Sequence, residues 1–330
     1  MLSLIWIKNY LLTSDISLLQ LFMDIKSYDD ELEGLYQLWR EVAKERANSA
    51  EKDITEFKKE YLKTPKNIDC QCFTIHKNSK IVGASILKLR ENKEKSFLDF
   101  LVPKERLHTE GAKELLKKSI GYCKEQAVFK ITLSPNIYPQ EVIDFFKKKG
   151  FKKSDEYPFG LWMKRELRDL PDLEIPEGID IFAVEDLEGP ILAKDLAEVH
   201  LDYVDKESFD LEDIIDQFKK MDEEKEDIFY CIAKQKETDE IVGFSRTVFV
   251  DLIRADNIAQ NVGLVVKEDN RKKGIGNALL VDSFHRAKER GYKKMYISTH
   301  SKNPAQKLYR RVGFELKRKF PNLCYEIEET

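Results

Sequence analysis

The stretch VVKEDNRKKGIGNALL, residues 265–280, indicates the end of a strand, a basic turn with two close glycines and the start of a helix. The first N–H groups of a helix have no partner inside the helix, and the helix dipole makes this end an anion site. Gly274 and Gly276 remove Cβ atoms that would keep a phosphate from the backbone, and the cations at 271–273 add charge-assisted contacts. A pyrophosphate fits successive amides better than a carboxylate does. A basic helix start with no ligand is the alternative.

Two common nucleotide motifs are missing from the sequence. No GxGxxG opens a first βα unit, and GxxxxGK[ST] does not occur. The anion site is therefore of another type.

The chain contains an internal repeat. KIVGASI (80–86) resembles EIVGFSR (240–246), and EVIDFFKKKGF (141–151) resembles PAQKLYRRVGF (304–314). Self-similarity at a nearly constant offset indicates two copies of one structural unit.

The repeat predicts the domain organisation. We expect an N-terminal extension at 1–22, a first domain at 23–165, a linker at 166–178 and a second domain at 179–330. The linker, ELRDLPDLEIPEG, has two prolines and a terminal glycine, which favour an extended segment.

Strands rich in Val, Ile and Phe and helices with an apolar stripe alternate in the second copy. The expected strands are 179–184, 228–235, 241–250, 259–266, 294–299, 314–320 and 323–328, and the expected helices are 189–203, 211–221, 274–290 and 304–312. The pattern predicts an α/β (α+β) fold in which each domain has a mixed, mostly antiparallel central sheet flanked by helices.

Composition limits the classes of function. Hydrophobic residues make up 42% of the 330 residues, enough for sizeable cores, and the net charge is only −4. We expect no nucleic-acid partner and no membrane span, because no basic face and no apolar run of sufficient length occur.

Five cysteines without framework spacing indicate a reducing cytoplasm. Cys70, Cys72 and His76 share a strand face, but without a second pair nearby we interpret them as buried strand residues and expect no metal site.

The order of these features resembles that of the GNAT superfamily of acyl-CoA-dependent N-acyltransferases. The resemblance rests on Arg-x-x-Gly-x-Gly (271–276) after a VV strand, followed by an Asn-capped helix that ends in LYRRVGF. It covers residues 179–328, is strongest in 260–314 and reaches the first copy only through the repeat. Two-domain members such as mycothiol synthase are similar in layout.

The resemblance implies a role for each matching residue, with acetyl-CoA as cosubstrate. The pyrophosphate would be held by Arg271, Lys272, Lys273, Gly274, Ile275, Gly276 and Asn277. Backbone groups of Leu264, Val265 and Val266 would pair with the pantetheine arm, and one of those amides would stabilise the oxyanion. Asn303 would contact the pantetheine, and Tyr309 would protonate the departing thiolate.

Several of these residues have a structural alternative. Asn303 is also a good N-cap, and Tyr309 lies on an apolar stripe, although its hydroxyl needs a partner. The position where the family often has a glutamate carries Gln260 and Asn261, so the general base is not identified. The acidic loop 200–213 offers Asp202 or Asp205, or only charges at a helix start.

The first copy departs from the motif. At the matched positions Arg271, Lys273, Gly276, Asn303 and Tyr309 are replaced by His108, Glu110, Lys113, Gln140 and Phe146. We expect a degenerate copy that keeps the fold without the chemistry.

The resemblance therefore implies an N-acetyltransferase. The second domain would transfer an acetyl group from acetyl-CoA to a primary amine of a small molecule or peptide, by direct attack in a ternary complex. A non-catalytic acyl-CoA sensor and an enzyme for a different acyl-CoA are the alternatives. A homodimer is possible.

Overall fold

The computed structural model divides into two compact units. The first unit comprises Met1–Phe159 with Phe320–Thr330, and the second comprises Gly160–Lys319. The residues that the structure describes are 24–29, 31–46, 52–62, 68–90, 94–133, 138–185, 190–201, 211–223, 227–250 and 258–327. The expected extension at 1–22 lies outside them.

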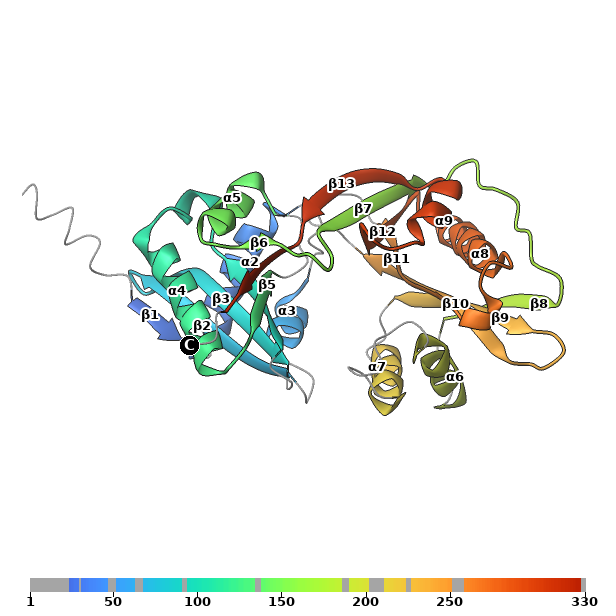
Figure 1. Ribbon diagram of the computed structural model, residues 1–330, viewed down its shortest axis with the longest axis horizontal. Helices are drawn as coiled ribbons and strands as arrows, with labels where there is room; N and C mark the ends of the chain where they lie inside the picture. The colour runs from blue at the N-terminus through green and yellow to red at the C-terminus, as the bar shows by residue number, and fades with distance from the viewer. Residues whose placement is uncertain are drawn as a thin grey trace, which may run out of the picture. The chain divides into compact units, whose positions relative to one another are not determined.

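The first unit has a seven-stranded sheet of order β1-β2-β3-β4-β5-β14-β6 (Figure 1). Its strands are β1 (Asp24–Ser27), β2 (Ile68–Lys77), β3 (Lys80–Arg90), β4 (Lys95–Leu101), β5 (Lys130–Leu133), β6 (Lys152–Lys153) and β14 (Leu323–Glu326). Its α-helices are α2 (Leu32–Ala43), α3 (Ile54–Tyr61), α4 (Glu110–Glu125) and α5 (Gln140–Lys148). Strands β4 and β5 are parallel, and the other described pairs are antiparallel.

The second unit repeats this plan in the order β13-β7-β12-β11-β10-β9-β8. Its strands are β7 (Phe159–Glu166), β8 (Ile179–Val184), β9 (Ile228–Gln235), β10 (Ile241–Val250), β11 (Ile258–Val266), β12 (Lys294–His300) and β13 (Glu315–Pro321). Its α-helices are α6 (Pro190–Leu201), α7 (Leu211–Glu223), α8 (Ile275–Glu289) and α9 (Gln306–Arg311). The predicted mixed, mostly antiparallel sheet flanked by helices is confirmed in both units.

The repeat is visible in how each long helix packs on its sheet. Ser119 of α4 donates a 2.8 Å hydrogen bond to Ser85 of β3, and Ser283 of α8 lies 2.9 Å from Ser245 of β10. In the second unit, α8 and α9 cover one face of the sheet, and α6 and α7 cover the other (Figure 1). The second sheet therefore lies between two helical layers.

Two strands pair in the sheet of the other unit from the one that their position in the sequence predicts. Strand β14, from the C-terminal end, pairs with β5 and β6 in the first sheet. Strand β7, which precedes the linker, pairs with β12 in the second sheet. The units therefore differ from the expected ranges 23–165 and 179–330, because strand periodicity predicts a strand but not which sheet edge it joins.

The described residues hold no helix long and apolar enough to span a bilayer. All five cysteines are free thiols, and burial raises the pKa of the Cys70, Cys72 and Cys123 thiols. His76 contacts Thr74 at 2.9 Å. Among the described residues no group of three His, Cys, Asp or Glu side chains is arranged as metal ligands.

Candidate functional site

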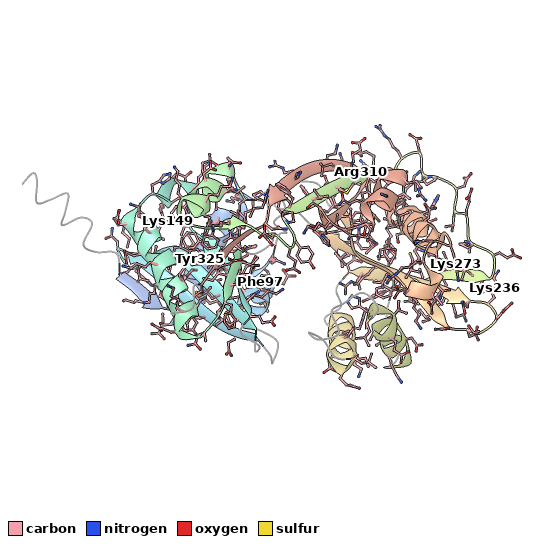
Figure 2. All side chains as sticks on the ribbon, in the orientation of Figure 1. Phe97, Lys149, Lys236, Lys273, Arg310 and Tyr325 are labelled. Atoms are coloured by element: carbon pink, nitrogen blue, oxygen red, sulfur yellow. The ribbon has the colours of Figure 1, made fainter. Side chains whose placement is uncertain are left out.

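The basic turn before α8 has an unusual backbone. Lys272 has a φ of 62° and Gly274 a φ of 87°. Left-handed residues in such a turn bring successive N–H groups together, as in anion-binding nests. The residues at 271–273 are exposed, and Figure 2 labels Lys273 at the start of α8. The turn thus combines positive side chains with clustered amide groups.

The N-terminus of α8 has no side-chain cap. Gly274 occupies the N-cap position, and among the described residues no side chain accepts a hydrogen bond from the first turn. The N–H groups of Asn277 and Ala278 both donate to Gly274 O. The amides before them can serve an external anion.

Gly276 is a point of close packing. A Cβ built there would lie 3.4 Å from Leu308 Cδ2, 3.8 Å from Val266 Cγ2 and 3.9 Å from Leu264 Cδ2. Its bare Cα therefore faces the end of β11 and α9. The structure differs here from the expectation that the missing side chain makes room for a phosphate: it brings the helix start against the strand.

Strands β11 and β12 separate beside this turn. Their parallel pairing covers three positions, Ala259↔Met295, Gln260↔Tyr296 and Asn261↔Ile297. Beyond these, β11 keeps its pairing with β10, and β12 keeps its pairing with β7. The edge of β11 that follows Asn261 is consequently open on the β12 side, and we call this region the splay.

Along β11, the backbone N–H and C=O groups of successive residues point alternately toward β10 and toward the splay. Lys267 N donates to Val242 O at the end of β10, so the N–H and C=O of Val266 point away from β10. Leu264, two residues earlier, has the same direction, whereas the backbone groups of Val265 point to β10. Of the three residues expected to pair with a pantetheine arm, Val265 is thus turned away.

Arg271 connects the basic turn to the end of β11 through a hydrogen bond. Its Nε donates a 2.9 Å hydrogen bond to Val266 O. The side chain expected to hold a pyrophosphate therefore also fixes the end of β11.

The side chain of Asn303 makes hydrogen bonds with residues close to it in the chain. Its Oδ1 accepts from Ala305 N at 2.9 Å, and its Nδ2 donates to Thr299 Oγ1 at 2.8 Å. These bonds close the turn that precedes α9, but Asn303 is not the N-cap: α9 begins at Gln306, and Ala305 occupies its N-cap position.

The side chain of Tyr309, a residue of α9, lies in the apolar core of the second unit. It is 5% exposed and packs with Leu280, Ile297 and Phe314 in one apolar cluster. Its backbone O accepts from Phe314 N, as Phe146 O accepts from Phe151 N in the first unit. The two aromatic residues therefore occupy equivalent positions.

A buried polar chain at the base of the splay is not anticipated by the motif. Asn261 Nδ2 donates to Ser245 Oγ at 2.7 Å, and Ser283 donates to Leu279 O at 2.8 Å. The serines of the repeat, in VGASI and VGFSR, are the signal in the sequence that could have indicated it.

Other proposed groups are placed as follows. Asp202 and Asp205 lie outside the described residues. Gln260 is half-buried on β11. Burial and then the charge of Arg246 lower the pKa of the His200 imidazole to about 4.

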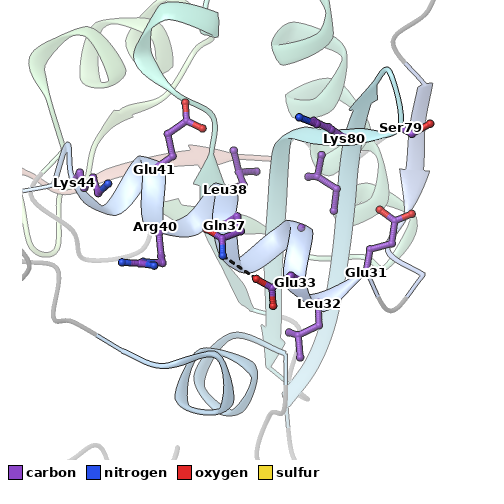
Figure 3. A pocket seen from close by; sticks show the side chains of 12 residues that line it. Glu31, Leu32, Glu33, Gln37, Leu38, Arg40, Glu41, Lys44, Ser79 and Lys80 are labelled. Atoms are coloured by element: carbon purple, nitrogen blue, oxygen red, sulfur yellow. Dashed lines mark hydrogen bonds between the residues drawn. The ribbon is translucent and has the colours of Figure 1, made fainter.

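The larger of the two described cavities lies elsewhere, in the first unit. It measures about 930 Å³ and is lined by α2 and the start of β3, including Glu33, Arg40, Glu41 and Lys80 (Figure 3). None of the predicted site residues lines it.

Comparisons with known proteins concern the family and the fold. Residues 193–314 match the model of the acetyltransferase (GNAT) family. A tandem GNAT protein from the clavulanic acid biosynthesis pathway is 16% identical, with a TM-score of 0.76 over 93% of this chain and 99% of that one. A GCN5-related N-acetyltransferase from Sphaerobacter thermophilus is 14% identical, with a TM-score of 0.69 over 93% and 96%. The comparison with curated proteins finds no match.

Proposed function

We propose that the second unit, in which residues 193–314 match the model of the acetyltransferase (GNAT) family, transfers an acetyl group from acetyl-CoA to a primary amine. The acceptor is a small molecule or a peptide. The amine attacks the thioester directly while both substrates are bound. The new bond is C–N, the broken bond is C–S, the amine loses a proton and the sulfur gains one.

The observation that carries this proposal is the uncapped start of α8 beside the open edge of β11. Amides at Gly274, Ile275 and Gly276, with the nearby cations, suit a pyrophosphate. From there the outward-facing backbone groups of Val266 and Leu264 suit the two amide groups of a pantetheine arm. The thioester end then lies toward Asn261, where the splay closes.

Tyr309 is the proposed proton donor to the departing thiolate. A free thiol has a pKa of about 8.5, so the thiolate leaves without a donor only at some cost. General acid catalysis typically contributes roughly 10²–10⁴-fold. We assign no residue as the base, since Gln260 is an amide.

The test of the proposal is a screen of an amine library with thiol detection at saturating acetyl-CoA. Release of CoA that depends on one class of amine supports the transferase. CoA binding without release by any amine would contradict it and favour an acyl-CoA sensor. Release only with longer acyl-CoA would assign a different acyl donor.

The number of CoA molecules per chain tests where the reaction occurs. In the first unit, Thr109 Oγ1 accepts from Ala112 N, and Glu110 pairs with Lys113. We therefore expect calorimetric titration with CoA to saturate at about one equivalent, with protection from hydrogen exchange at the start of α8. Saturation at two equivalents, or protection at the start of α4, would contradict the assignment of a degenerate first copy.

A further inference from the structure

Two buried polar atoms lie side by side in register at the base of the splay. Thr247 on β10 is the cross-strand partner of Asn261 on β11. Thr247 is fully buried and Asn261 is 2% exposed. Thr247 Oγ1 and Asn261 Oδ1 make no hydrogen bond with any described residue. Buried polar atoms of this kind are normally satisfied.

The hydrogen bonds around Asn261 show which atom of its side-chain amide lacks a partner. Asn261 Nδ2 donates to Ser245 Oγ, which also lies 2.9 Å from Ser283 Oγ, so the amide nitrogen of Asn261 already has a partner. The remaining atom, Oδ1, is therefore an acceptor that needs a donor. The hydroxyl of Thr247 can donate and accept.

The strand is irregular at the same place. The register between β10 and β11 shifts between Arg246, paired with Gly263, and Thr247, paired with Asn261. Val262 is thus the extra residue of a β-bulge, and it is 37% exposed. The pairing of β11 with β12 also ends at Asn261.

The first unit is apolar and regular at the equivalent positions. When Ser85 and Ser245 are aligned, Leu87 corresponds to Thr247 and Leu98 to Asn261. Both leucines are fully buried, and the pairing of β3 with β4 has no register shift. The fold can therefore fill this space with apolar side chains, and only the second unit carries the polar pair together with the bulge.

We propose that Thr247 and Asn261 bind one buried water molecule that holds the Val262 bulge in place and thereby sets the open edge of β11. The water donates to Asn261 Oδ1 and exchanges a second hydrogen bond with Thr247 Oγ1, which gives it two fixed partners. Thr247 and Asn261 are positioning residues, since they act through the backbone of β11. Their role in acyl-CoA binding rests on the proposed function, but the water site itself does not.

The first arm of the test needs no ligand. A crystal structure of the full chain without CoA is expected to show a water within hydrogen-bond distance of both atoms. In Thr247→Val, which keeps the side-chain shape, and in Asn261→Leu, this water is absent. The amides of Gly263 and Val265, which face β10, are expected to exchange at least about tenfold faster in the double variant, because the bulge loses a buried hydrogen-bonded anchor. Density without a water, or unchanged exchange, would overturn the proposal.

The second arm measures CoA affinity by calorimetry. Thr247→Val/Asn261→Leu is expected to weaken CoA binding about tenfold without lowering the melting temperature, and Thr247→Ser is expected to bind like the wild type. The matched control, Leu87→Val in the first unit, removes one methylene without touching the splay and is expected to leave CoA affinity unchanged. A double variant that binds CoA as tightly as the wild type would overturn the positioning role.

The two proposals fail differently. If the wild-type chain does not bind CoA, the proposed function falls, and the first arm still decides the water site. If the wild type binds CoA and the first arm shows no water, the inference alone falls.

Discussion

The starts of α4 and α8 are equivalent positions in two copies of one fold, but they differ in whether a side chain caps the free backbone N–H groups. Thr109 caps α4 by accepting from Ala112 N at 3.3 Å, whereas Gly274 leaves α8 without a side-chain cap. Helix α4 also carries Glu110 in its first turn, which satisfies the helix dipole internally. Of these two helix starts, that of α8 therefore has amides available for an external anion.

The opposite face of the sheet shows the same contrast. With Ser85 and Ser245 aligned, Asp99 in the first unit corresponds to Gly263 in the second. Asp99 accepts a 2.9 Å hydrogen bond from the buried guanidinium of Arg46, which also lies 4.9 Å from the Tyr138 ring. Burial lowers the pKa of Arg46, but Tyr138 and Asp99 outweigh it and raise the pKa above its ordinary value. The first unit thus holds a cation of its own beside β4, and the second has no side chain at this position of β11.

The largest expected effect concerns this buried pair. Asp99→Ala leaves the Arg46 charge buried without its carboxylate and should destabilise the first unit by about 3–5 kcal/mol. Urea unfolding, with hydrogen exchange to locate the loss, measures it. Glu114→Ala, which removes an exposed pair with Lys117, is the control and should cost less than about 1 kcal/mol. Equal effects of the two changes would show that the Arg46–Asp99 pair contributes no more than a surface contact.

The next effect concerns the aromatic residue that differs between the copies. Tyr309→Phe removes one oxygen and retains the ring, and Phe146 shows that the equivalent helix packs with phenylalanine. We expect kcat to fall about 10²-fold or more, with little change in acetyl-CoA affinity and in melting temperature. Steady-state kinetics on the identified acceptor, with chemistry shown to be rate-limiting, measures this. A variant that retains the wild-type kcat would make Tyr309 a core residue like its counterpart.

A smaller effect is expected at the start of α8. Gly276→Glu places a carboxylate between the helix start and β11 and should weaken CoA binding at least about tenfold, since it opposes the phosphate charge. Gly276→Ala is the steric control, because its Cβ would stand at an ordinary 3.4 Å from Leu308. Lys113→Glu at the equivalent position of α4 should leave affinity unchanged. Calorimetry showing full affinity in a folded Gly276→Glu would remove the turn from the binding site.

The smallest effect concerns the cap of α4. Thr109→Ala removes the side chain that accepts from Ala112 N and should cost about 1 kcal/mol of unfolding free energy, roughly fivefold in the unfolding constant. CoA affinity should not change, because we propose the CoA site at the start of α8 and not here. If the variant instead gained a second CoA equivalent, the cap would be what keeps the first copy from binding.

Much of the site could be predicted from local sequence. Gly274, Lys272 and Lys273 are neighbours in the chain, so the turn and the helix start follow from residue types alone. The hydrogen bond that Asn303 accepts from Ala305 N, two residues later, is equally local. The bulge at Val262 and the Thr247–Asn261 pair could not be predicted, because they depend on the register between β10 and β11.

The sequence by itself determined the repeat, the order of strands and helices, and the basic glycine turn before α8, because hydrophobic periodicity and turn chemistry act over a few neighbouring residues. Only the tertiary structure decided that β14 completes the first sheet and β7 the second. It also decided that Leu264 and Val266, and not Val265, face the splay. These features arise from hydrogen bonds between residues far apart in the chain, which leave no local pattern of side chains.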